Sequence, residues 1–163
     1  MRLFVAVMPP GDVLDRLAFL RRPERPGVRW TRRDQWHVTL AFLGEVADPG
    51  PVVAALDAAP LAPATAVLGP AVAALGRRVV CVPVGGLGDL AGAVRHTVAP
   101  GEHEARPFRG HVTLARVQRG RIGDLVGEPV GGRFAVGDVR LVRSHLGAGG
   151  PRYEDLHVRA LAA

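Results

Sequence analysis

The tetrapeptide His-Val-Thr-Leu occurs twice in this chain, at residues 37–40 and 111–114. In a β-strand alternate side chains share a face, so each copy would present an imidazole and a hydroxyl side by side. Histidine titrates near neutral pH, so one ring could accept a proton while the other donates one. Two such pairs brought together would suit proton transfer at a phosphate whose oxygens are held by the hydroxyls.

The four side chains that we expect to carry this chemistry are His37, Thr39, His111 and Thr113. In the hydrolysis of a phosphodiester, one imidazole would activate the attacking water and the other would protonate the leaving oxygen. The threonine hydroxyls would donate hydrogen bonds to the non-bridging oxygens. Neither motif strand contains Asp, Glu or Cys as a metal ligand. We therefore predict a site with no metal and no cofactor.

Regular alternation assigns the other residues of the motif strands to two faces. Ala41 and Ala115 would lie on the same face as the histidines. The even-numbered apolar residues should face the core, and these are Val38, Leu40, Phe42, Val112 and Leu114. Such alternation alone would also be found in an ordinary half-exposed strand, so the argument depends on the two copies being brought together.

The residues around the motifs predict alternating strands and helices. Short apolar runs predict strands at 2–8, 28–31, 36–43, 64–68, 71–75, 78–84, 110–117, 133–146 (with a break near Gly137) and 152–160. Helices are expected from Gly11 to Leu20 with Asp12 as N-cap, at 52–59 and at 87–98. Gly69-Pro70 indicates a hairpin between its flanking strands, and 100–110 should be a polar loop.

The order of elements repeats in the two halves of the chain. Strand, helix, Arg/Pro-rich loop and motif strand follow one another from Phe4 to His37 and, over a similar length, from Val80 to His111. A duplicated β-α-β unit related by a pseudo-twofold would place the motif strands in equivalent, facing positions. We therefore expect one domain over residues 1–163, with two pseudo-symmetric lobes and both histidines in one cleft. The alternative is a coincidence of two ordinary strands.

The charge of the chain favours a polyanionic partner. The formal net charge is +6, and all 21 cationic residues are arginine, a choice that a GC-biased genome would explain. A basic surplus favours nucleic acid. The single cysteine, Cys81, cannot form an internal disulfide, and neither a bilayer-spanning run nor a signal peptide is evident. We expect a cytoplasmic monomer with no membrane partner.

The motifs and their surroundings resemble the 2H phosphoesterase superfamily, which is defined by two His-x-Thr-x motifs. The closer resemblance is to the bacterial and archaeal RNA 2′,3′-cyclic phosphodiesterases, historically called 2′-5′ RNA ligases. It rests on Arg-Leu-Phe-Val-Ala-Val at 2–7, Val-Arg-Trp at 28–30 with Gln-Trp-His-Val-Thr-Leu-Ala-Phe-Leu-Gly-Glu at 35–45, Arg-Pro-Phe-Arg-Gly-His-Val-Thr-Leu-Ala-Arg at 106–116, and the C-terminal segment 144–153.

The resemblance implies an α/β (α+β) fold in which two mainly antiparallel sheets flank a basic cleft, with helices on the outside. It implies hydrolysis of RNA 2′,3′-cyclic phosphate ends, or of cyclic nucleotides, to 2′-phosphates. It assigns His37 as the general acid and His111 as the base, with Thr39 and Thr113 on the phosphate. The histidines would exchange roles if the reaction ran backward as ligation.

Arg116 matches an arginine that often follows the second motif, and it could clamp the phosphate bidentately. On a regular strand its even number would point it away from His111, so a bulge or the end of the strand would have to re-aim it. A plain surface charge is the alternative. Cys81 stands where the family often carries Trp, and an apolar strand disfavours its thiolate.

The remaining histidines and aromatics have weaker claims to the site. Four histidines lack a motif partner and are predicted to be surface or structural residues, namely His96, His103, His145 and His157. Four aromatic side chains could stack on a base, although core packing is expected for most of them, and these are Phe4, Phe42, Phe108 and Tyr153.

Three other functions remain open. A 2′-5′ RNA ligase or a small-molecule cyclic phosphodiesterase would keep the site and change the substrate. A non-catalytic binder of RNA ends would use the basic cleft without turnover. A domain with no site at all would hold the two histidines far apart.

Overall fold

The computed structural model describes residues 1–99 and 106–162. The strands are β1 (Arg2–Val7), β2 (Val28–Trp30), β3 (Val38–Glu45), β4 (Ala64–Leu68), β5 (Ala73–Leu75), β6 (Val79–Gly85), β7 (His111–Val117), β8 (Gly132–Val136), β9 (Asp138–His145) and β10 (Arg152–Ala160). The helices are α1 (Gly11–Ala18), α2 (Gly50–Ala58) and α3 (Gly88–Val98), and short 3-10 turns lie at η1 (Arg33–Gln35) and η2 (Gly123–Leu125). No helix in these residues is long and apolar enough to cross a bilayer.

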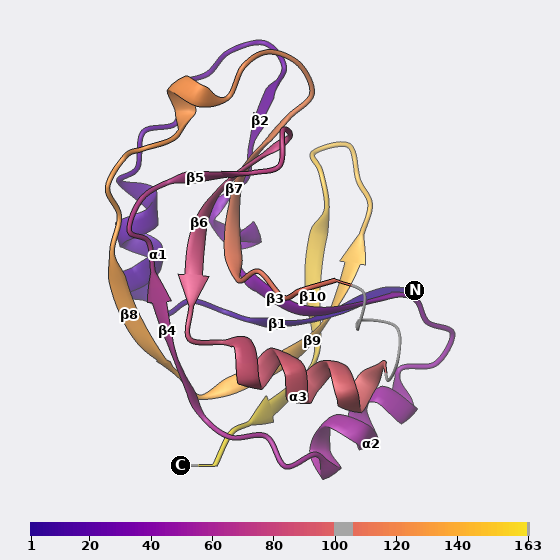
Figure 1. Ribbon diagram of the computed structural model, residues 1–163. Helices are drawn as coiled ribbons and strands as arrows, with labels where there is room; N and C mark the ends of the chain where they lie inside the picture. Colours follow the sequence, from indigo (N-terminus) through magenta and orange to yellow (C-terminus); the bar gives the residue numbers. More distant parts are fainter. Residues whose placement is uncertain (100–105, 163) are drawn as a thin grey trace.

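The strands form one curled antiparallel sheet in the order β10-β9-β1-β3-β7-β6-β4-β8 (Figure 1). Outside this path, β2 pairs with β7 and β5 pairs with β6. The two antiparallel sheets expected from the resemblance are thus found as two halves of one sheet, β10 to β3 and β7 to β8. This arrangement confirms the mixed α+β fold.

The two halves meet where the motif strands lie side by side. A single residue pair, Val38 with Val112, joins β3 to β7 in antiparallel register. On either side of this junction the chain repeats strand, helix, strand, as β1-α1-β3 and as β6-α3-β7. Within each unit the two strands are neighbours, since β1 pairs with β3 and β6 pairs with β7. The repeat expected from the sequence is therefore present in the element order and in the strand pairing.

The helices cover the face of the sheet that carries the apolar motif residues. Val38 and Val112 are fully buried in one core cluster with Leu17 of α1 and Val94 of α3. The helices also cross between the halves, because α1 contacts β8 and α3 contacts β3, while α2 packs on α3 and β10 (Figure 1). The histidines and threonines of the motifs are consequently left on the opposite face.

Two expectations about local structure are wrong. β4 and β5 do not form a hairpin, because the chain between them crosses from one neighbour to another: Gly69 N–H donates to Pro83 O, and Val72 N–H donates to Glu128 O. Asp12 is not the N-cap of α1. The N-cap is Pro10, two residues earlier, and its carbonyl accepts a hydrogen bond from Leu14 N–H. The expected break near Gly137 is confirmed between β8 and β9.

Gly110 sets how closely β6 can approach the start of the second motif. Its carbonyl accepts a hydrogen bond of 2.8 Å from Val84 N–H, and a Cβ at this position would collide with the Val84 carbonyl oxygen. We expect Gly110→Ala to lower the free energy of unfolding by about 2 kcal/mol, because the two strands must move apart. Urea unfolding followed by circular dichroism measures this change.

Gly92→Ala is the matched control for that substitution. Gly92 lies in α3, and a Cβ there would meet no atom within 4 Å. The same added methyl group should therefore raise stability by about 0.5–1 kcal/mol, because alanine favours the helix. Equal effects of the two substitutions would contradict the close approach at Gly110.

Candidate active site

The described residues surround a cavity of about 480 Å³ on the face opposite the helices. All five side chains singled out in the sequence line it, namely His37, Thr39, His111, Thr113 and Arg116. The other lining residues are Arg2, Leu3, Phe4, Arg29, Trp30, Thr31, Gln35, Phe42, Gly44, Ser144, Leu146, Pro151 and Tyr153. The cavity therefore draws on both halves of the sheet and on the β9–β10 hairpin.

The Val38–Val112 pair explains why the motifs meet. If the antiparallel register is continued by one residue in each direction, His37 lies across from Thr113 and Thr39 lies across from His111. The two valines point into the core, so their neighbours point to the other face. The histidine and the threonine of both motifs accordingly line one cavity.

A β-bulge in the second motif re-aims Arg116. Opposite β6, Ala115 pairs with Val80 and Thr113 pairs with Cys81, so Leu114 is an extra residue on β7. An extra residue shifts the alternation of side chains by one position. Leu114 and Ala115 are both buried, and Arg116 turns to the cavity face with Thr113. The sequence required a bulge or a strand end to turn Arg116 toward the face of His111, and this bulge does so.

The first motif has the same bulge, which corrects the face expected for three residues. Opposite β1, Ala41 pairs with Val5 and Thr39 pairs with Ala6, so Leu40 is the extra residue. Ala41 and Ala115 are therefore buried instead of facing the cavity with the histidines. Phe42 was expected in the core, but its side chain is 66% exposed and lines the cavity. Phe42 is the counterpart of Arg116 in the other half.

Both imidazoles are held by the backbone in the same way. His37 Nδ1 lies 2.8 Å from Gln35 O, and His111 Nδ1 lies 2.7 Å from Arg109 O. Because a carbonyl only accepts, each Nδ1 carries the proton, and each Nε2 is left as the basic nitrogen. His37 Nε2 lies 3.0 Å from Thr39 Oγ1, whose hydroxyl can donate to it. The two rings are thus fixed in the tautomer that accepts a proton at Nε2.

The surroundings of His37 disfavour its charged form. Its ring stacks on Phe4 with centroids 4.8 Å apart and forms a T-shaped contact with Tyr153, with centroids 5.1 Å apart. Burial lowers the pKa of His37 from 6.5 to about 4, and the hydrogen bond to Gln35 opposes this effect. The positive charges of His111 and Arg116 lower the pKa further. His37 is therefore neutral at pH 7.

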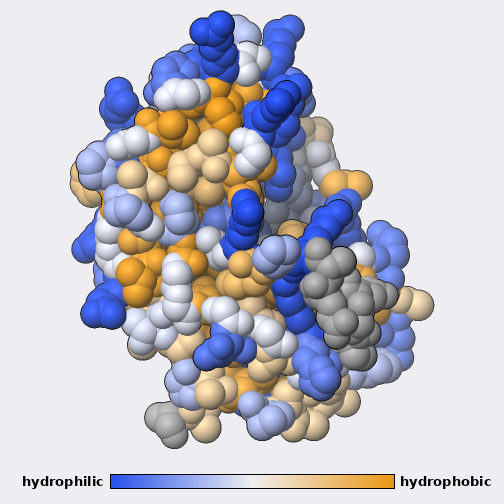
Figure 2. Space-filling model, in the orientation of Figure 1, coloured by the Kyte–Doolittle hydropathy of each residue, from blue (hydrophilic) through white to orange (hydrophobic). Residues whose placement is uncertain are grey.

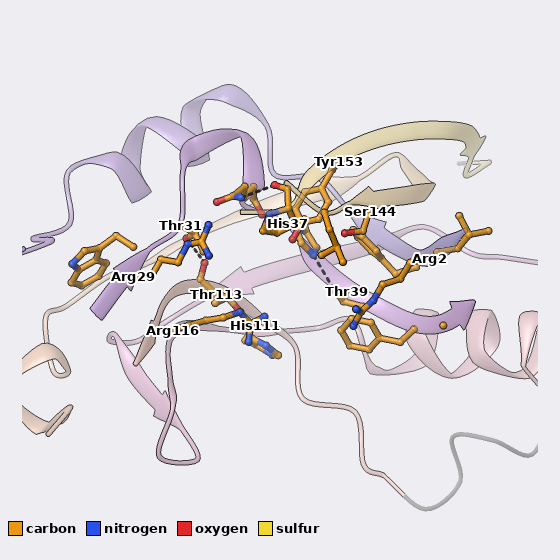
Figure 3. A pocket seen from close by; sticks show the side chains of 18 residues that line it. Arg2, Arg29, Thr31, His37, Thr39, His111, Thr113, Arg116, Ser144 and Tyr153 are labelled. Carbon is orange, nitrogen blue, oxygen red and sulfur yellow. Dashed lines mark hydrogen bonds between the residues drawn. The ribbon is translucent and has the colours of Figure 1, made fainter. Parts of the chain in front are cut away.

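The charged side chains that line the cavity are arginines. Arg2, Arg29 and Arg116 line it, no carboxylate does, and none of these arginines forms an ion pair within the described residues. In Figure 3, Arg29 and Arg2 lie at opposite ends of the cavity with His37 between them. Figure 2 shows hydrophilic side chains along the hollow between the surface over β2 and β7 and the β9–β10 hairpin. Such a lining attracts an extended anion.

The turn of the β9–β10 hairpin is tied to the segment before His37. Arg32 Nη1 donates to Gly149 O at 2.8 Å, and Gln35 Nε2 donates to Pro151 O at 2.8 Å. Tyr153, next to this turn, forms the T-shaped contact with His37. Burial raises the pKa of the Tyr153 phenol, while the charges of Arg116, Arg2 and Arg32 act in the opposite direction. The hairpin thus closes one wall of the cavity.

Among the described residues, the other histidines and the cysteine do not line the cavity. His145 pairs with Glu154 at 3.0 Å, His157 pairs with Asp57 at 2.7 Å, and His96 is exposed on α3. His103 lies outside the described residues. Cys81 is buried in β6, and burial raises the pKa of its thiol to about 11. The described residues contain no group of three or more His, Cys, Asp or Glu side chains that could hold a metal ion.

Several lining residues were not singled out from the sequence. Arg2, Arg29, Thr31 and Gln35 reach the cavity through strand pairings and a 3-10 turn that the sequence pattern does not encode. Their signal in the sequence is only proximity: Arg29 and Thr31 flank Trp30, a few residues before the first motif. No spacing rule would have separated them from the other surface arginines and threonines.

The ionisation of His37 provides a direct test of this geometry. We expect its ring to titrate near pH 4 in an NMR titration, because burial disfavours the imidazolium ion. Arg116→Ala should raise the pKa of His37 modestly, because it removes a positive charge. Phe4→Ala should raise it more, because water gains access to the ring. An ordinary value of 6.5 for His37 in the unmodified protein would contradict the arrangement.

Comparison with known proteins finds similar structures that cover nearly the whole chain. A family model described as LigT like phosphoesterase matches residues 7–68. The crystal structure of TT0787 from Thermus thermophilus is 30% identical, with a TM-score of 0.76 over 99% of this chain and 98% of that chain. Apo LigT of E. coli is also 30% identical, with a TM-score of 0.81 over the same shares.

A third structure, E. coli LigT complexed with 3′-AMP, is 30% identical to this chain, with a TM-score of 0.80 and coverage of 99% and 98%. No curated protein sequence matches the chain. The match of fold, the near-complete coverage of both chains and the level of identity agree with the doubled motif. This chain belongs to the LigT-like phosphoesterase family of the 2H phosphoesterase superfamily.

Proposed function

We propose that this phosphoesterase hydrolyses the 2′,3′-cyclic phosphate ends of RNA to 2′-phosphates by metal-independent acid–base catalysis. One observation carries the proposal: two histidines, each fixed with Nε2 as the basic nitrogen, line one cavity together with the threonines of both motifs and three arginines. A phosphate between them would meet a proton acceptor on one side and a proton donor on the other.

The reaction assigns one step to each side chain. His111 Nε2 takes a proton from water, whose oxygen attacks phosphorus while the bond from phosphorus to the 3′ oxygen breaks. His37 Nε2 delivers a proton to the departing 3′ oxygen, and the phosphate remains on the 2′ oxygen. Thr39, Thr113 and the guanidinium of Arg116 bind the non-bridging oxygens as charge builds on them.

To act as an acid, His37 must carry a proton on Nε2, and the ring lacks this proton in the free protein at pH 7. Its pKa of about 4 leaves the ring neutral, with Nε2 accepting from Thr39. An anionic phosphate in the cavity raises the pKa of an adjacent imidazole, because it stabilises the positive charge. Thr39 can then turn its hydroxyl from the ring to a phosphate oxygen. We propose that substrate binding and protonation of His37 occur together.

RNA is the proposed substrate because cationic groups extend beyond the reacting centre. Arg2 and Arg29 lie at opposite ends of the cavity, so a chain of phosphates can meet a positive charge on either side (Figure 3). Phe42 offers an exposed ring at the cavity wall on which a base can stack. Solved complexes of the E. coli relative with 3′-AMP, ATP and NADP+ support a nucleotide-like ligand.

We also propose that the chain acts as one cytoplasmic domain, as a monomer. The support is that one hydrophobic cluster includes residues of both halves, and that the lining of the cavity comes from a single chain. A buried lone thiol, Cys81, suits a reducing compartment.

Alanine substitution of the two histidines tests the reaction. We expect His37→Ala and His111→Ala each to lower kcat/KM for 2′,3′-cyclic AMP and for a cyclic-phosphate RNA oligonucleotide by at least about a hundredfold, because each removes a proton-transfer group. The assay contains excess EDTA, and chromatography separates the 2′- from the 3′-phosphate product. The matched control is His157→Ala, which lies outside the cavity. Full activity in either cavity variant, or loss of wild-type activity in EDTA, would refute the mechanism.

The same assay separates the alternative functions. Joining of 2′,3′-cyclic ends to 5′-hydroxyl RNA as the main reaction would indicate a ligase. Turnover of mononucleotides alone would indicate a small-molecule phosphodiesterase. Tight binding of cyclic ends without product would indicate an RNA-end binder.

An activated leaving group tests which histidine is the acid. p-Nitrophenolate departs without being protonated, so bis(p-nitrophenyl) phosphate does not need the general acid. We expect His37→Ala to retain much more of its activity on this substrate than on 2′,3′-cyclic AMP, whereas His111→Ala should be impaired equally on both. Release of p-nitrophenol is followed by absorbance. If His111→Ala is the variant that is spared, the two roles are reversed.

A further inference from the structure

The paired bulges leave two backbone carbonyls that need partners from outside the motif strands. Leu40 and Leu114 are the extra residues, and both are buried, at 0% and 1% exposed. The extra residue of a bulge leaves the regular ladder, and a buried carbonyl without a partner is costly. Whatever bonds to these two carbonyls therefore helps to hold each bulge at its leucine.

Thr31 bonds to the carbonyl in the second motif. Its backbone N–H lies 2.8 Å from Leu114 O, and its hydroxyl lies 2.9 Å from the same oxygen and 2.8 Å from Thr113 O. Because a hydroxyl has one proton, it shares that proton between the two carbonyls. Thr31 directly follows β2, which pairs with β7 so that Arg29 lies opposite Arg116. The Leu114 carbonyl and the backbone of Arg116 therefore both contact the segment formed by β2 and Thr31.

The Thr31 hydroxyl also connects the two motifs. It accepts a hydrogen bond of 3.0 Å from Nε1 of Trp36, a buried side chain that immediately precedes His37. The Thr31 hydroxyl oxygen therefore links Trp36, which precedes the first histidine, to the bulge at Leu114, which follows the second. Figure 3 shows Thr31 close to Thr113 on the side of the cavity where Arg116 lies.

Arg95 bonds to the carbonyl in the first motif. It projects from α3, and its Nε donates to Leu40 O at 2.9 Å. Its Nη1 donates to Arg106 O at 3.1 Å, and its guanidinium lies 5.2 Å from the centre of the Phe108 ring. Those contacts fix the guanidinium, so the hydrogen bond to Leu40 is made by a held group and not by a free surface chain.

The position of each bulge decides which side chain enters the cavity. If Leu114 rejoined a regular ladder, Arg116 would point into the core, and if Leu40 did so, Phe42 would leave the cavity wall. A one-residue slip exchanges the two faces of a strand. The position of each bulge is thus coupled to the side chain that faces the cavity, Arg116 in one half and Phe42 in the other.

We propose that Thr31 and Arg95 are positioning residues, and that Thr31 fixes the bulge that aims Arg116 while Arg95 fixes the bulge that aims Phe42. Neither needs to touch the substrate. The choice of substrate in the tests rests on the proposed function, whereas the placement of the two side chains does not.

A double-mutant cycle tests Thr31. Thr31→Val keeps the shape and removes the hydroxyl. We expect it to lower kcat/KM for 2′,3′-cyclic AMP by about tenfold in the wild type, but by less than about twofold in an Arg116→Ala background, because the contact it supports is already gone. Equal losses in both backgrounds would overturn the link to Arg116, since a general loss of stability acts independently of that side chain.

Two further variants distinguish the proposed role of the Thr31 hydroxyl from a simple folding defect. Thr31→Ser keeps the hydroxyl and should retain activity within about twofold; a tenfold loss would overturn the proposal even if Thr31→Val failed to fold. Thr97→Val is the matched control, because Thr97 also donates to a backbone carbonyl, Ala93 O at 2.8 Å, but lies on α3 outside the cavity. It should leave kcat/KM unchanged.

Substrates with and without a base test Arg95. We expect Arg95→Met to raise KM for 2′,3′-cyclic AMP by about fivefold, with kcat nearly kept, and to change KM for methyl riboside 2′,3′-cyclic phosphate by less than about twofold. The effect should disappear in a Phe42→Ala background. Arg159→Met is the matched control, because Arg159 also donates to backbone carbonyls, Leu56 O and Ala59 O, but does not line the cavity. Equal effects on both substrates would overturn the link to Phe42.

Crystal structures of the variants separate this proposal from the proposed function. In Thr31→Val the Arg116 side chain should leave its place in the cavity or take more than one orientation, and in Arg95→Met the same should hold for Phe42. These results would stand even if the wild type turned over no cyclic phosphate. Unmoved Arg116 and Phe42 side chains would overturn the positioning roles, whatever the activity.

Discussion

The pairing of Val38 with Val112 is the contact on which the rest of the site depends. It is the one ladder pair between β3 and β7, and both side chains are completely buried. Burial of this pair fixes which face of each strand is apolar, so the histidine and threonine on either side of each valine must face the cavity. It also joins the two motif strands in antiparallel register, so the histidine and threonine of both motifs line the same cavity. Core packing and site geometry are therefore consequences of the same contact.

The two halves have similar backbones but different side chains, and this difference gives the cavity two distinct ends. The two bulges fall at equivalent leucines, and each turns the residue two positions later into the cavity. In one half that residue is Arg116 and in the other it is Phe42. The same kind of bulge thus supplies a cation on one side of the cavity and a flat apolar surface on the other. The burial of His37 against Phe4 adds a second difference, because it lowers the pKa of His37.

The sequence could predict the repeated unit, most strand positions, the α+β class and the five side chains that the structure brings to one cavity. These predictions succeeded because the patterns behind them are local: a doubled tetrapeptide, apolar runs and turn residues. The face of Phe42 was wrong because a bulge depends on the neighbouring strand, and no local pattern reports one. The hairpin at Gly69 was wrong for the same reason, since β4 finds its partners in β6 and β8. Thr31 and Arg95 act through contacts with residues distant in sequence, which one sequence does not reveal.

Helices α1 and α3 each contact a strand of the other half, and this affects how the two halves can separate. α1 contacts β8 and α3 contacts β3, so the apolar core of each half is completed by a helix from the other. Neither half can swing away as a rigid lobe without exposing the interior of both. Opening that separates the two histidines therefore costs a large share of the global folding free energy, and the site stays assembled through smaller fluctuations. The cleft is thus a groove in a body whose two halves share one hydrophobic cluster, so moving its walls apart would expose that shared core.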